Sequence, residues 1–509
     1  MMTATSTREL LDWLRATAPS AQLALDSRRV TPGDIFFACQ HESGDSRHYI
    51  TQAIDAGAAA VVFDDADGIM WRDEWSVPYL MTTGLAQQIG PIAHDWYGRP
   101  DAGLFSVAVT GTNGKTSCTQ WLGQALSRLG APTAVVGTLG IGLYSDGSSG
   151  PFIETGYTTP DPIQLYRQLA ERKAQGAQAI AIEASSIGLA QQRMDELHVD
   201  CAVLTNFTRD HLDFHGSMQA YEHAKSRLFA WPGLRYAVIN LDDPFGLRLI
   251  PFLRKANPAT QILGYSVEGA AVDGIDSFTA AEIRTTQHGS SFQLRTAQGS
   301  GTVRTHLIGR FNVSNALAIA AVLSVRGVSF EKVVGLLESL QAVPGRMQQL
   351  GGVDAPLVVI DYAHTPDALQ KVLDTLRPVA DARHGALWCV FGCGGERDPG
   401  KRPHMGLAAD RADHIMVTSD NPRSEEPGHI IAQIVEGVPN TQHHKLQVIE
   451  DRATAILSTI RHAGKHDVIL LAGKGHEAYQ EIKGRRLAFR DADHAALALA
   501  SCATRHGGH

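Results

Sequence analysis

The sequence predicts an α/β protein of three domains, the central one built on a doubly wound, mainly parallel sheet. Apolar runs typical of buried strands alternate with segments of helical periodicity, and most of these runs end in a polar or glycine-rich cluster. A chain of 509 residues is also too long for one ordinary core. The turn-rich strings WYGRPDAG and AVPGR mark boundaries that divide the chain into residues 1–100, 101–342 and 343–509.

The composition is that of a globular protein in a reducing compartment. Apolar residues make up 44% and charged residues 19% of the chain. The net charge is −8, and no Lys/Arg-rich run suggests a nucleic-acid partner. The chain has no secretory pattern, no run of roughly 18 apolar residues that would cross a membrane, and six dispersed cysteines. We therefore expect a cytoplasmic protein without nucleic-acid or membrane partners. A monomer is also expected, although the composition does not determine the oligomeric state.

The first two domains differ in their expected elements. The N-terminal domain is predicted to be a small α/β unit, with strands at 33–39 and 58–65 around a helix at 49–57. In the central domain, a strand at 104–110 leads through a glycine-rich turn into a helix at 115–129. Further elements of the central domain are strands at 179–186, 199–207 and 235–243, a small antiparallel insertion at 265–305, and a helix at 312–327.

The C-terminal domain is predicted to be Rossmann-like. Four apolar runs, each ending in a polar or glycine-rich cluster, are expected as strands at 356–364, 386–395, 414–423 and 467–477. Ligands of open α/β sheets bind beyond the carboxyl ends of the strands. Four such endings therefore predict a binding crevice more strongly than one would.

The most specific motif is the loop between the strand at 104–110 and the following helix. Its glycines let backbone N–H groups close around phosphate oxygens, and the helix N-terminus favours an anion. Lys115 is expected to meet the β- and γ-phosphates, and the Thr116 hydroxyl to ligate Mg²⁺. Val109 stands where a full Walker pattern has glycine. The predicted ATP-binding loop consists of Gly111, Thr112, Asn113, Gly114, Lys115, Thr116 and Ser117.

A lysine lies on the apolar stripe of a helix expected to begin after the N-cap Ser217. Tyr221, Lys225 and Leu228 share this stripe by their spacing. A lone ammonium there must reach solvent, pair with an acid or lose its charge. We expect the side chain to snorkel to solvent. The chemical alternative is a carbamate on Nζ, which would turn a cation into a carboxylate-like metal ligand.

Acidic and histidine residues follow two of the central strands. Glu183 ends the first, and the string NFTRDHLDFHG, which contains His211, ends the second. Each alone is more often a capped or salt-bridged turn. Beside a phosphate loop, oxygen donors and imidazole suit a Mg²⁺–phosphate site, so ATP with two metal ions is expected.

These motifs occur together, and in the same order, in the Mur ligases, which this chain resembles over roughly residues 20 to 490. The strings that carry the resemblance are GTNGKTS, EASS, NFTRDHLDFHG, the Lys225 helix, GRFNVSNALA, DYAHTPDAL, GGERDPGKRP, DNPR and AGKGHE. The likeness is greatest to members that add the third peptide residue to a UDP-N-acetylmuramoyl dipeptide. It implies an ATP-dependent ligase of peptidoglycan precursor synthesis that works through an acyl phosphate.

The resemblance implies roles for individual residues. The catalytic set would be Lys115, Glu183, His211 and carbamylated Lys225, and the two Mg²⁺ ions would be held by Thr116, Glu183, His211 and Lys225. Around the nucleotide or the domain junction it places Asn312, Asn315, Arg346, Asp361 and His364. Contacts to UDP-MurNAc-dipeptide would come from Ser27, Glu42, Ser43, Gly44, Thr158, Thr159, Ser185, Gln191 and Arg193.

The string DNPR bears on the amino acid that is added. Arginine can hold a carboxylate with two parallel hydrogen bonds, which suits the distal carboxylate of meso-diaminopimelate. Family members with this string add diaminopimelate, and lysine-adding members lack the arginine. The resemblance therefore implies a diaminopimelate site formed by Arg397, Asp420, Asn421, Pro422, Arg423, Gly473 and Glu477.

The chain departs from the family pattern at Tyr157, at Ile187 and in the loop 40–44, all on the UDP-substrate side. Two other functions remain open from the residues alone. Folylpolyglutamate synthetases share a similar phosphate loop but lack the N-terminal UDP domain and the DNPR string. A regulatory P-loop ATPase would not need four ligand-bearing strand ends in a third domain.

Overall fold

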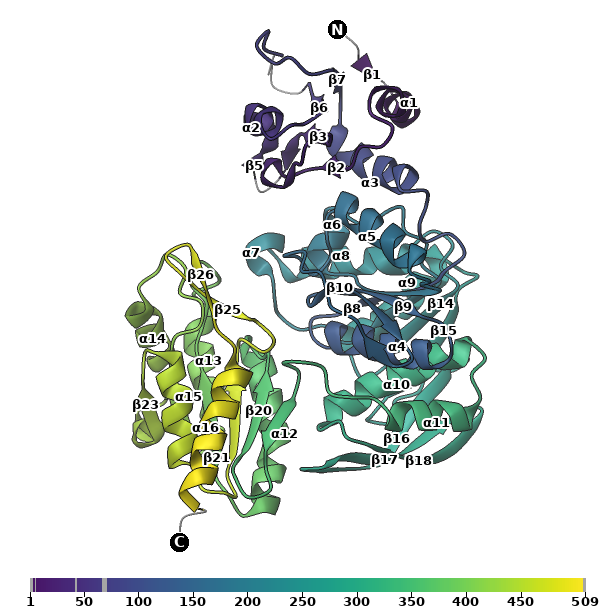
Figure 1. Cartoon of the computed structure of the whole chain (residues 1–509). Coiled ribbons are helices and arrows are strands. Elements are labelled where there is room, and N and C mark those ends of the chain that lie inside the picture. The colour runs from purple at the N-terminus through teal and green to yellow at the C-terminus, as the bar shows by residue number, and fades with distance from the viewer. Residues whose placement is uncertain (1–2, 5, 42–43, 66–70, 507–509) are drawn as a thin grey trace. The chain divides into compact units, whose positions relative to one another are not determined.

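The structure, a computed structural model, describes the whole chain except residues 1–2, 5, 42–43, 66–70 and 507–509 (Figure 1). Its three large sheets each fall in one predicted domain, and helices flank the strands, so the α/β class is confirmed. By its internal contacts the chain forms two compact units, residues 1–108, 126–200 and 231–233 in one and 109–125, 201–230 and 234–509 in the other. The boundaries at residues 100 and 342 therefore stay a prediction.

The N-terminal sheet is entirely parallel. Its strands lie in the order β1 (Thr3–Ala4), β7 (Tyr79–Thr82), β6 (Ala60–Asp64), β3 (Ile35–Ala38) and β2 (Leu23–Ala24). The helices are α1 (Thr7–Thr17), α2 (Ile50–Asp55) and α3 (Leu85–Trp96), and a short hairpin joins β4 (Gln40–His41) to β5 (Gly44–Asp45). The strands β3 and β6 and the helix α2 confirm the elements expected here, because their apolar residues form one core.

The central sheet has eleven strands. Their order is β11 (Ser148–Ser149), β10 (Gly140–Ser145), β9 (Thr133–Gly137), β12 (Ala179–Glu183), β8 (Phe105–Thr110), β13 (Cys201–Leu204), β14 (Tyr236–Asn240), β15 (Gln261–Ser266), β16 (Asp276–Thr286), β17 (Gly289–Thr296) and β18 (Gly299–Thr305). From β8 the chain goes to β9 and β12 on one side and to β13 and β14 on the other. The carboxyl end of β8 is thus a topological switch point, where open α/β sheets bind ligands.

The helices of the central region are α4 (Lys115–Arg128), α5 (Pro162–Ala174), α6 (Ser186–Ala190), α7 (Leu212–His215), α8 (Met218–Ser226), α9 (Pro244–Ala256), α10 (Arg310–Val325) and α11 (Phe330–Glu338). Helix α10 packs against β14, β15 and β16. The stretch predicted as a small antiparallel insertion is antiparallel from β16 to β18, but β16 pairs with β15 in parallel, so it widens the main sheet. Strand β16 joins the main sheet because α10 covers one continuous apolar face across β14, β15 and β16.

The C-terminal sheet is doubly wound. Its order is β19 (Gln348–Gly351), β20 (Leu357–Asp361), β24 (Val468–Ala472), β21 (Leu387–Phe391), β22 (His414–Val417) and β23 (Leu446–Val448), and all neighbours except β19 and β20 are parallel. A separate hairpin pairs β25 (Tyr479–Ile482) with β26 (Arg485–Ala488). The four strands expected in this domain are all present, in shortened form, because each expected range included the loop that follows its strand.

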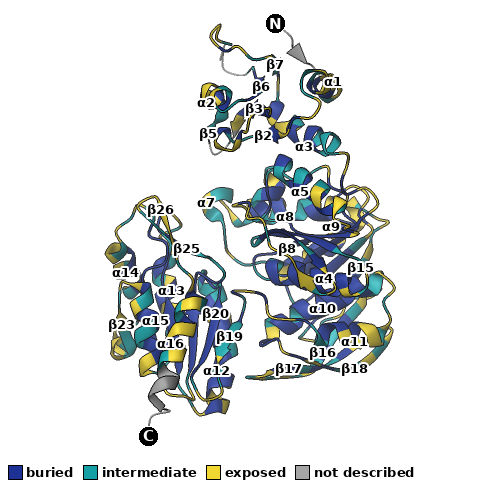
Figure 2. Ribbon diagram, in the orientation of Figure 1, coloured by how far each residue is buried: buried dark blue, intermediate teal, exposed yellow. Residues whose placement is uncertain are grey.

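Alternate residues of these strands face two apolar cores. Val359, Cys389 and Leu470 pack with α12 (Pro366–Arg383), α13 (Lys401–Ala409) and α14 (Pro427–Val435). Val358, Val390 and their neighbours pack with α15 (Arg452–His462) and α16 (Asp491–His506). Figure 2 shows the resulting pattern, buried strands between helices whose outer faces are exposed. Among the described residues, none of the helices has the length and apolar character needed to cross a membrane.

Candidate active site

The phosphate loop begins at a backbone position that only glycine fits. Gly111 has a φ of +146°, and a Cβ built on it would lie 1.9 Å from Thr205 Oγ1. Gly114 has a φ of +89°, and a Cβ there would lie 2.8 Å from Asn315 Oδ1. Strand β8 therefore turns into α4 through two positions that exclude side chains. The turn places the expected Asn315 of α10 directly against the loop.

The end of β13 holds the loop in shape. Thr205 Oγ1 donates a hydrogen bond to the Asn113 carbonyl at 2.6 Å, and Asn206 Nδ2 donates to the same oxygen at 2.9 Å. In return, the backbone N–H of Asn113 donates to Asn206 Oδ1 at 2.9 Å, and that of Thr112 to the Asn206 carbonyl. The loop is thus preorganised by neighbouring strand-end residues.

Two lysines meet at one carbonyl oxygen of this loop. Lys115 Nζ donates to the Gly111 carbonyl at 2.9 Å, and Lys225 Nζ donates to the same oxygen at 2.8 Å. Lys225 is only 1% exposed, so the expectation that it snorkels to solvent is wrong. Helix α8, capped by Ser217 as predicted, buries Tyr221, Ala224 and Lys225, and its lysine finds a partner in the Gly111 carbonyl instead of solvent. Burial, with the nearby charge of Lys115, lowers the pKa of Lys225 well below its ordinary value.

An aromatic ring and a histidine complete this group. The Lys225 ammonium lies 4.6 Å from the centre of the Tyr221 ring, and the Tyr221 hydroxyl is 3.1 Å from Thr112 Oγ1. His211 adopts a left-handed backbone with a φ of +52° at the start of α7. Burial, together with the charges of Lys115 and Lys225, lowers the pKa of His211. The lowered pKa favours the neutral imidazole, although the Asp210 carboxylate, 3.5 Å from Nε2, acts in the opposite direction.

Glu183 ends β12 and is fully buried. Its Oε1 accepts a hydrogen bond from the Thr138 backbone N–H at 2.8 Å, and its Oε2 accepts from the Thr138 hydroxyl at 3.1 Å. The Thr138 hydroxyl in turn lies 3.2 Å from Thr158 Oγ1. A Cβ on Gly137 would lie 2.1 Å from Glu183 Oε1, so the carboxylate depends on a glycine at the end of β9.

The predicted dipeptide contacts lie together next to Glu183. Thr159 Oγ1 donates to the Glu183 carbonyl at 2.7 Å and lies 2.9 Å from Ser185 Oγ. Arg193 donates to the Thr159 carbonyl at 2.8 Å and to Gln191 Oε1 at 2.5 Å. Its guanidinium lies 4.6 Å from the centre of the Tyr157 ring. Tyr157, one of the departures from the family pattern, therefore makes a cation–π contact with Arg193.

Three of the five predicted residues of the nucleotide and domain-junction set lie in α10 and at the end of β20. Asn312 and Asn315 are buried in α10, and Asn312 Nδ2 donates to the Ile308 carbonyl at 2.8 Å. Asp361 ends β20, and its Oδ2 accepts from the Met347 backbone N–H at 2.9 Å. Burial raises the pKa of Asp361.

Two more members of that set flank a tyrosine of the C-terminal domain. The Arg346 guanidinium lies 4.6 Å from the centre of the Tyr362 ring. His364 Nδ1 donates to the Tyr362 carbonyl at 2.8 Å, and burial lowers the pKa of His364 to about 4. The imidazole is therefore neutral near pH 7, with Nε2 as its acceptor.

A fully buried lysine joins the predicted diaminopimelate residues at the ends of β22 and β24. Lys474 Nζ donates to Glu477 Oε2 at 3.0 Å and to Asn421 Oδ1 at 3.1 Å, and it lies 3.9 Å from Asp420 Oδ1. Asn421 Nδ2 donates to the same Glu477 oxygen at 2.8 Å. Gly473 has a φ of +107°, and a Cβ there would lie 2.6 Å from Asp420 Oδ2.

The two predicted arginines differ in their surroundings. Arg423 follows Pro422 with a left-handed φ of +52°, and its Nη1 donates to the Gly395 carbonyl at 2.6 Å. Its Nε is 3.6 Å from Glu481 Oε2. Arg397 is exposed in the loop after β21. A half-buried and an exposed guanidinium therefore stand on the loops that follow adjacent strands, β21 and β22.

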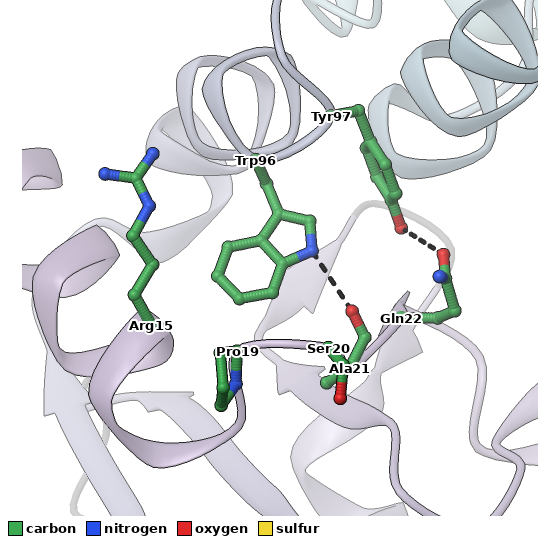
Figure 3. A pocket seen from close by; sticks show the side chains of 7 residues that line it. All are labelled: Arg15, Pro19, Ser20, Ala21, Gln22, Trp96 and Tyr97. Carbon is green, nitrogen blue, oxygen red and sulfur yellow. Dashed lines mark hydrogen bonds between the residues drawn. The ribbon is translucent and has the colours of Figure 1, made fainter. Parts of the chain in front are cut away.

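The uridine-side residues are only partly described. Ser27 is buried and donates to Gln52 Oε1 at 3.0 Å, and Gly44 opens β5. Glu42 and Ser43 lie outside the described residues. The same domain has a hollow of about 280 Å³ (Figure 3), lined by Arg15, Pro19, Ser20, Ala21, Gln22, Trp96 and Tyr97. Its Trp96 donates to the Ala21 carbonyl and its Tyr97 to Gln22, and none of the predicted substrate residues that the structure describes lines it.

Several residues of these groups were not among the predicted site residues. They are Thr138, Thr205, Asn206, Tyr221 and Lys474. Asn206 and Tyr221 lie in motifs that had been singled out, and Lys474 lies in the glycine-rich end of a predicted strand. Thr138 and Thr205 are single hydroxyls at strand ends, and no local pattern distinguishes them from structural threonines.

The donor set fits magnesium better than a metal held by the protein alone. Within the described residues, no group of three or more His, Cys, Asp or Glu side chains is arranged to hold a metal. Magnesium is usually bound by one or two carboxylates together with substrate phosphates and water. Glu183, a single buried carboxylate, is consistent with that mode.

Comparison with known proteins places these groups in a family context. Residues 109–323 match the Mur ligase middle domain, and residues 345–475 match the Mur ligase glutamate ligase domain. UDP-N-acetylmuramoyl-L-alanyl-D-glutamate–2,6-diaminopimelate ligase of Janthinobacterium sp. (strain Marseille) is 56% identical over 98% of each chain. The protein of the same name from Ralstonia nicotianae is 49% identical over 97% of this chain and 96% of its own.

A solved structure agrees with this result. The structure of a UDP-N-acetylmuramoyl-L-alanyl-D-glutamate–2,6-diaminopimelate ligase is 36% identical to this chain. The match covers 95% of each chain with a TM-score of 0.63.

The Gly111 geometry predicts that Gly111→Ala weakens ATP binding by at least roughly 100-fold, because the new methyl group displaces Thr205 from the loop. Gly130→Ala is the matched control, since Gly130 also has a positive φ, +82°, but open space around its Cβ. The control should lose about 1 kcal/mol of stability and keep its ATP affinity. Calorimetry in magnesium buffer and thermal unfolding measure the two effects, and normal ATP affinity in the Gly111→Ala variant would contradict the assignment.

Proposed function

The chain belongs to the Mur ligase family, and we propose that it is the ATP-dependent ligase that adds meso-2,6-diaminopimelate to UDP-MurNAc-L-Ala-D-Glu. The observation that carries the proposal is the 56% identity, over 98% of both chains, to a relative named for this reaction. The phosphate loop with its two lysines, the group around Glu183 and the group at the ends of β22 and β24 support it. The enzyme would act in the cytoplasm, as a monomer, on small molecules of peptidoglycan precursor synthesis.

In the first step, the γ-phosphoryl group of ATP passes to the γ-carboxylate of D-glutamate and gives an acyl phosphate and ADP. Lys115 and the loop amides bind the phosphates, and their role is mainly positioning and electrostatic. Thr158, Thr159, Ser185, Gln191 and Arg193 would hold the dipeptide. The strand order supports this arrangement, because β12 and β13 flank β8.

Magnesium, in one or two ions, would offset negative charge on the transferring group. Thr116, Glu183, His211 and the modified Lys225 are the residues of this chain that we propose to hold it. The Asn315 side chain lies against Gly114 of the loop and would restrict the space around the bound nucleotide. Arg346, Asp361 and His364 would serve the nucleotide from the C-terminal domain.

In the second step, the neutral amine of diaminopimelate attacks the acyl carbon, an amide bond forms, and phosphate leaves. Arg423 and Arg397 would bind the distal carboxylate, and Glu477 would accept a hydrogen bond from the distal ammonium. The Glu477 Oε2 atom already accepts from Lys474 and Asn421, which leaves Oε1 for the substrate. Asp420, Asn421, Pro422 and Gly473 would form the wall of this pocket.

Phosphate release should require both UDP-MurNAc-L-Ala-D-Glu and diaminopimelate. A folylpolyglutamate synthetase would instead respond to a folate and glutamate, and a regulatory ATPase would release phosphate without either substrate. Lys115→Ala serves as the inactive control, because it removes the ammonium that meets the phosphates. Release by the unmodified protein in the absence of both substrates would overturn the ligase assignment.

Lys225 is proposed to carry a carbamate. The reaction joins the Nζ lone pair to the carbon of CO₂ and releases one proton, so it needs the neutral amine that burial favours. Protein equilibrated with ¹³C-bicarbonate should show a carbamate resonance that Lys225→Arg lacks. The exposed Lys332→Arg is the control and should keep the signal. If the signal is the same in all three proteins, the lysine is unmodified.

Arg423→Lys should raise the KM for diaminopimelate by about 10- to 100-fold, because an ammonium cannot make the paired hydrogen bonds of a guanidinium. The KM for ATP should stay unchanged. Steady-state kinetics with diaminopimelate and with L-lysine measure both the affinity and the preference. Unaltered kinetics would show that Arg423 does not bind the substrate.

A further inference from the structure

A buried arginine and a glutamate form a pair beside the proposed amino-acid site. Arg402, in the first turn of α13, has a side chain that is 1% exposed. Its Nη1 donates to Glu425 Oε2 and its Nη2 to Glu425 Oε1, both at 2.9 Å. This paired geometry fixes the orientation of both groups more firmly than a single contact would.

The same pair reaches further parts of the C-terminal domain. Arg402 Nη1 also donates to Gln433 Oε1 of α14 at 2.7 Å, and Nη2 donates to the Gly394 carbonyl at 3.2 Å. Glu425 Oε1 accepts from the Glu396 backbone N–H at 2.6 Å. The pair therefore connects the loop after β21 and the loop after β22 with the helices α13 and α14.

These two loops carry the arginines proposed to read the distal carboxylate. The Gly395 N–H donates to the Asn421 carbonyl at 2.9 Å, and Arg423 Nη1 donates to the Gly395 carbonyl at 2.6 Å. A Cβ on Gly395 would lie 2.0 Å from the Pro422 carbonyl, so the loops are in close contact. Arg397 follows two residues after Gly395. A shift of one loop against the other would change the spacing of the two guanidinium groups.

We propose that Arg402 and Glu425 are positioning residues that set the spacing of Arg397 and Arg423 and thereby the selection of an amino acid with a distal carboxylate. This inference rests on the proposed function. Both oxygens of Glu425 and both Nη atoms of Arg402 are engaged within the protein, so the pair acts through the loops rather than as a ligand of the substrate. The two hydrogen bonds from Arg402 lower the pKa of Glu425 to about 2, so the pair stays ionised throughout the pH range of the assay.

The test is the variant Glu425→Gln, which keeps the shape of the side chain but removes its charge and one acceptor oxygen. The KM for diaminopimelate should rise by about 10-fold, while kcat and the KM for ATP stay within about 2-fold. Turnover of L-lysine, which lacks the distal carboxylate, should not change. The preference for diaminopimelate over L-lysine should therefore fall by about the same factor as the affinity.

Asp413→Asn is the matched control. Asp413 accepts from Arg377 Nη1 at 2.7 Å and from the Leu387 backbone N–H at 2.8 Å, as Glu425 accepts from an arginine and a backbone N–H. It precedes β22, at the opposite end of the strand from Glu425. The control should lose thermal stability and keep its KM for diaminopimelate.

The outcomes separate this inference from the proposed function. If the unmodified protein does not use diaminopimelate, the proposed function fails. If it does, and Arg423→Lys raises the KM while Glu425→Gln and Arg402→Lys do not, only the positioning role is overturned. A parallel fall of kcat and of both substrate affinities in Glu425→Gln would also overturn it, since that pattern indicates a general loss of structure. Arg402→Lys keeps the charge but loses the paired geometry, and it should change the same constant in the same direction.

Discussion

Two lysine side chains on one carbonyl oxygen are the constraint around which the catalytic region is organised. Lys115 and Lys225 both donate to the carbonyl of Gly111, one from the phosphate loop and one from α8. Like charges held this close repel each other, and burial strengthens the repulsion because little water screens it. The arrangement is relieved when an anion binds or when one amine loses its charge. The proposed chemistry uses both, since ATP supplies the anion and carbamylation removes a cation.

This convergence depends on the backbone rather than on the lysines alone. Gly111, whose carbonyl both side chains contact, has a φ of +146° and no Cβ. The hydroxyl of Thr205 occupies the space that a side chain would need, and it also donates to the carbonyl of Asn113. The end of β13, Gly111 and helix α8 thus determine together where the amines of Lys115 and Lys225 lie. The phosphate loop is the part of this unit that its local sequence reveals.

Much of the fold could be predicted from the sequence, because buried strands have a local signature. The runs at 356–364, 386–395, 414–423 and 467–477 became β20, β21, β22 and β24, each followed by a residue of the proposed site. The predicted insertion at 265–305 proved to be part of the main sheet. Strand β16 pairs in parallel with β15, and the antiparallel pattern of β17 and β18 gives no sign of that pairing.

The site was predictable only where a residue type is unusual for its surroundings. Lys225 is unusual on an apolar stripe, but the prediction that its side chain reaches solvent is wrong. The stripe shows which face of the helix is buried and not which groups pack against that face. The carbonyl of Gly111 lies 114 residues away along the chain. Thr138 had no such signal, since its hydroxyl is ordinary until β9 places it against Glu183.

The two buried lysines outside the phosphate loop show how partners decide the chemistry of one residue type. Lys474 makes an ion pair with Glu477 at 3.0 Å and a hydrogen bond to Asn421, so its charge has a counter-ion inside the protein. Lys225 donates to the carbonyl that Lys115 also contacts, and it lies over an aromatic ring. The Lys474 side chain holds Glu477 and Asn421 in place. An ammonium that loses its proton readily exposes a nucleophilic nitrogen, so Lys474 suits a positioning role and Lys225 suits reaction with CO₂.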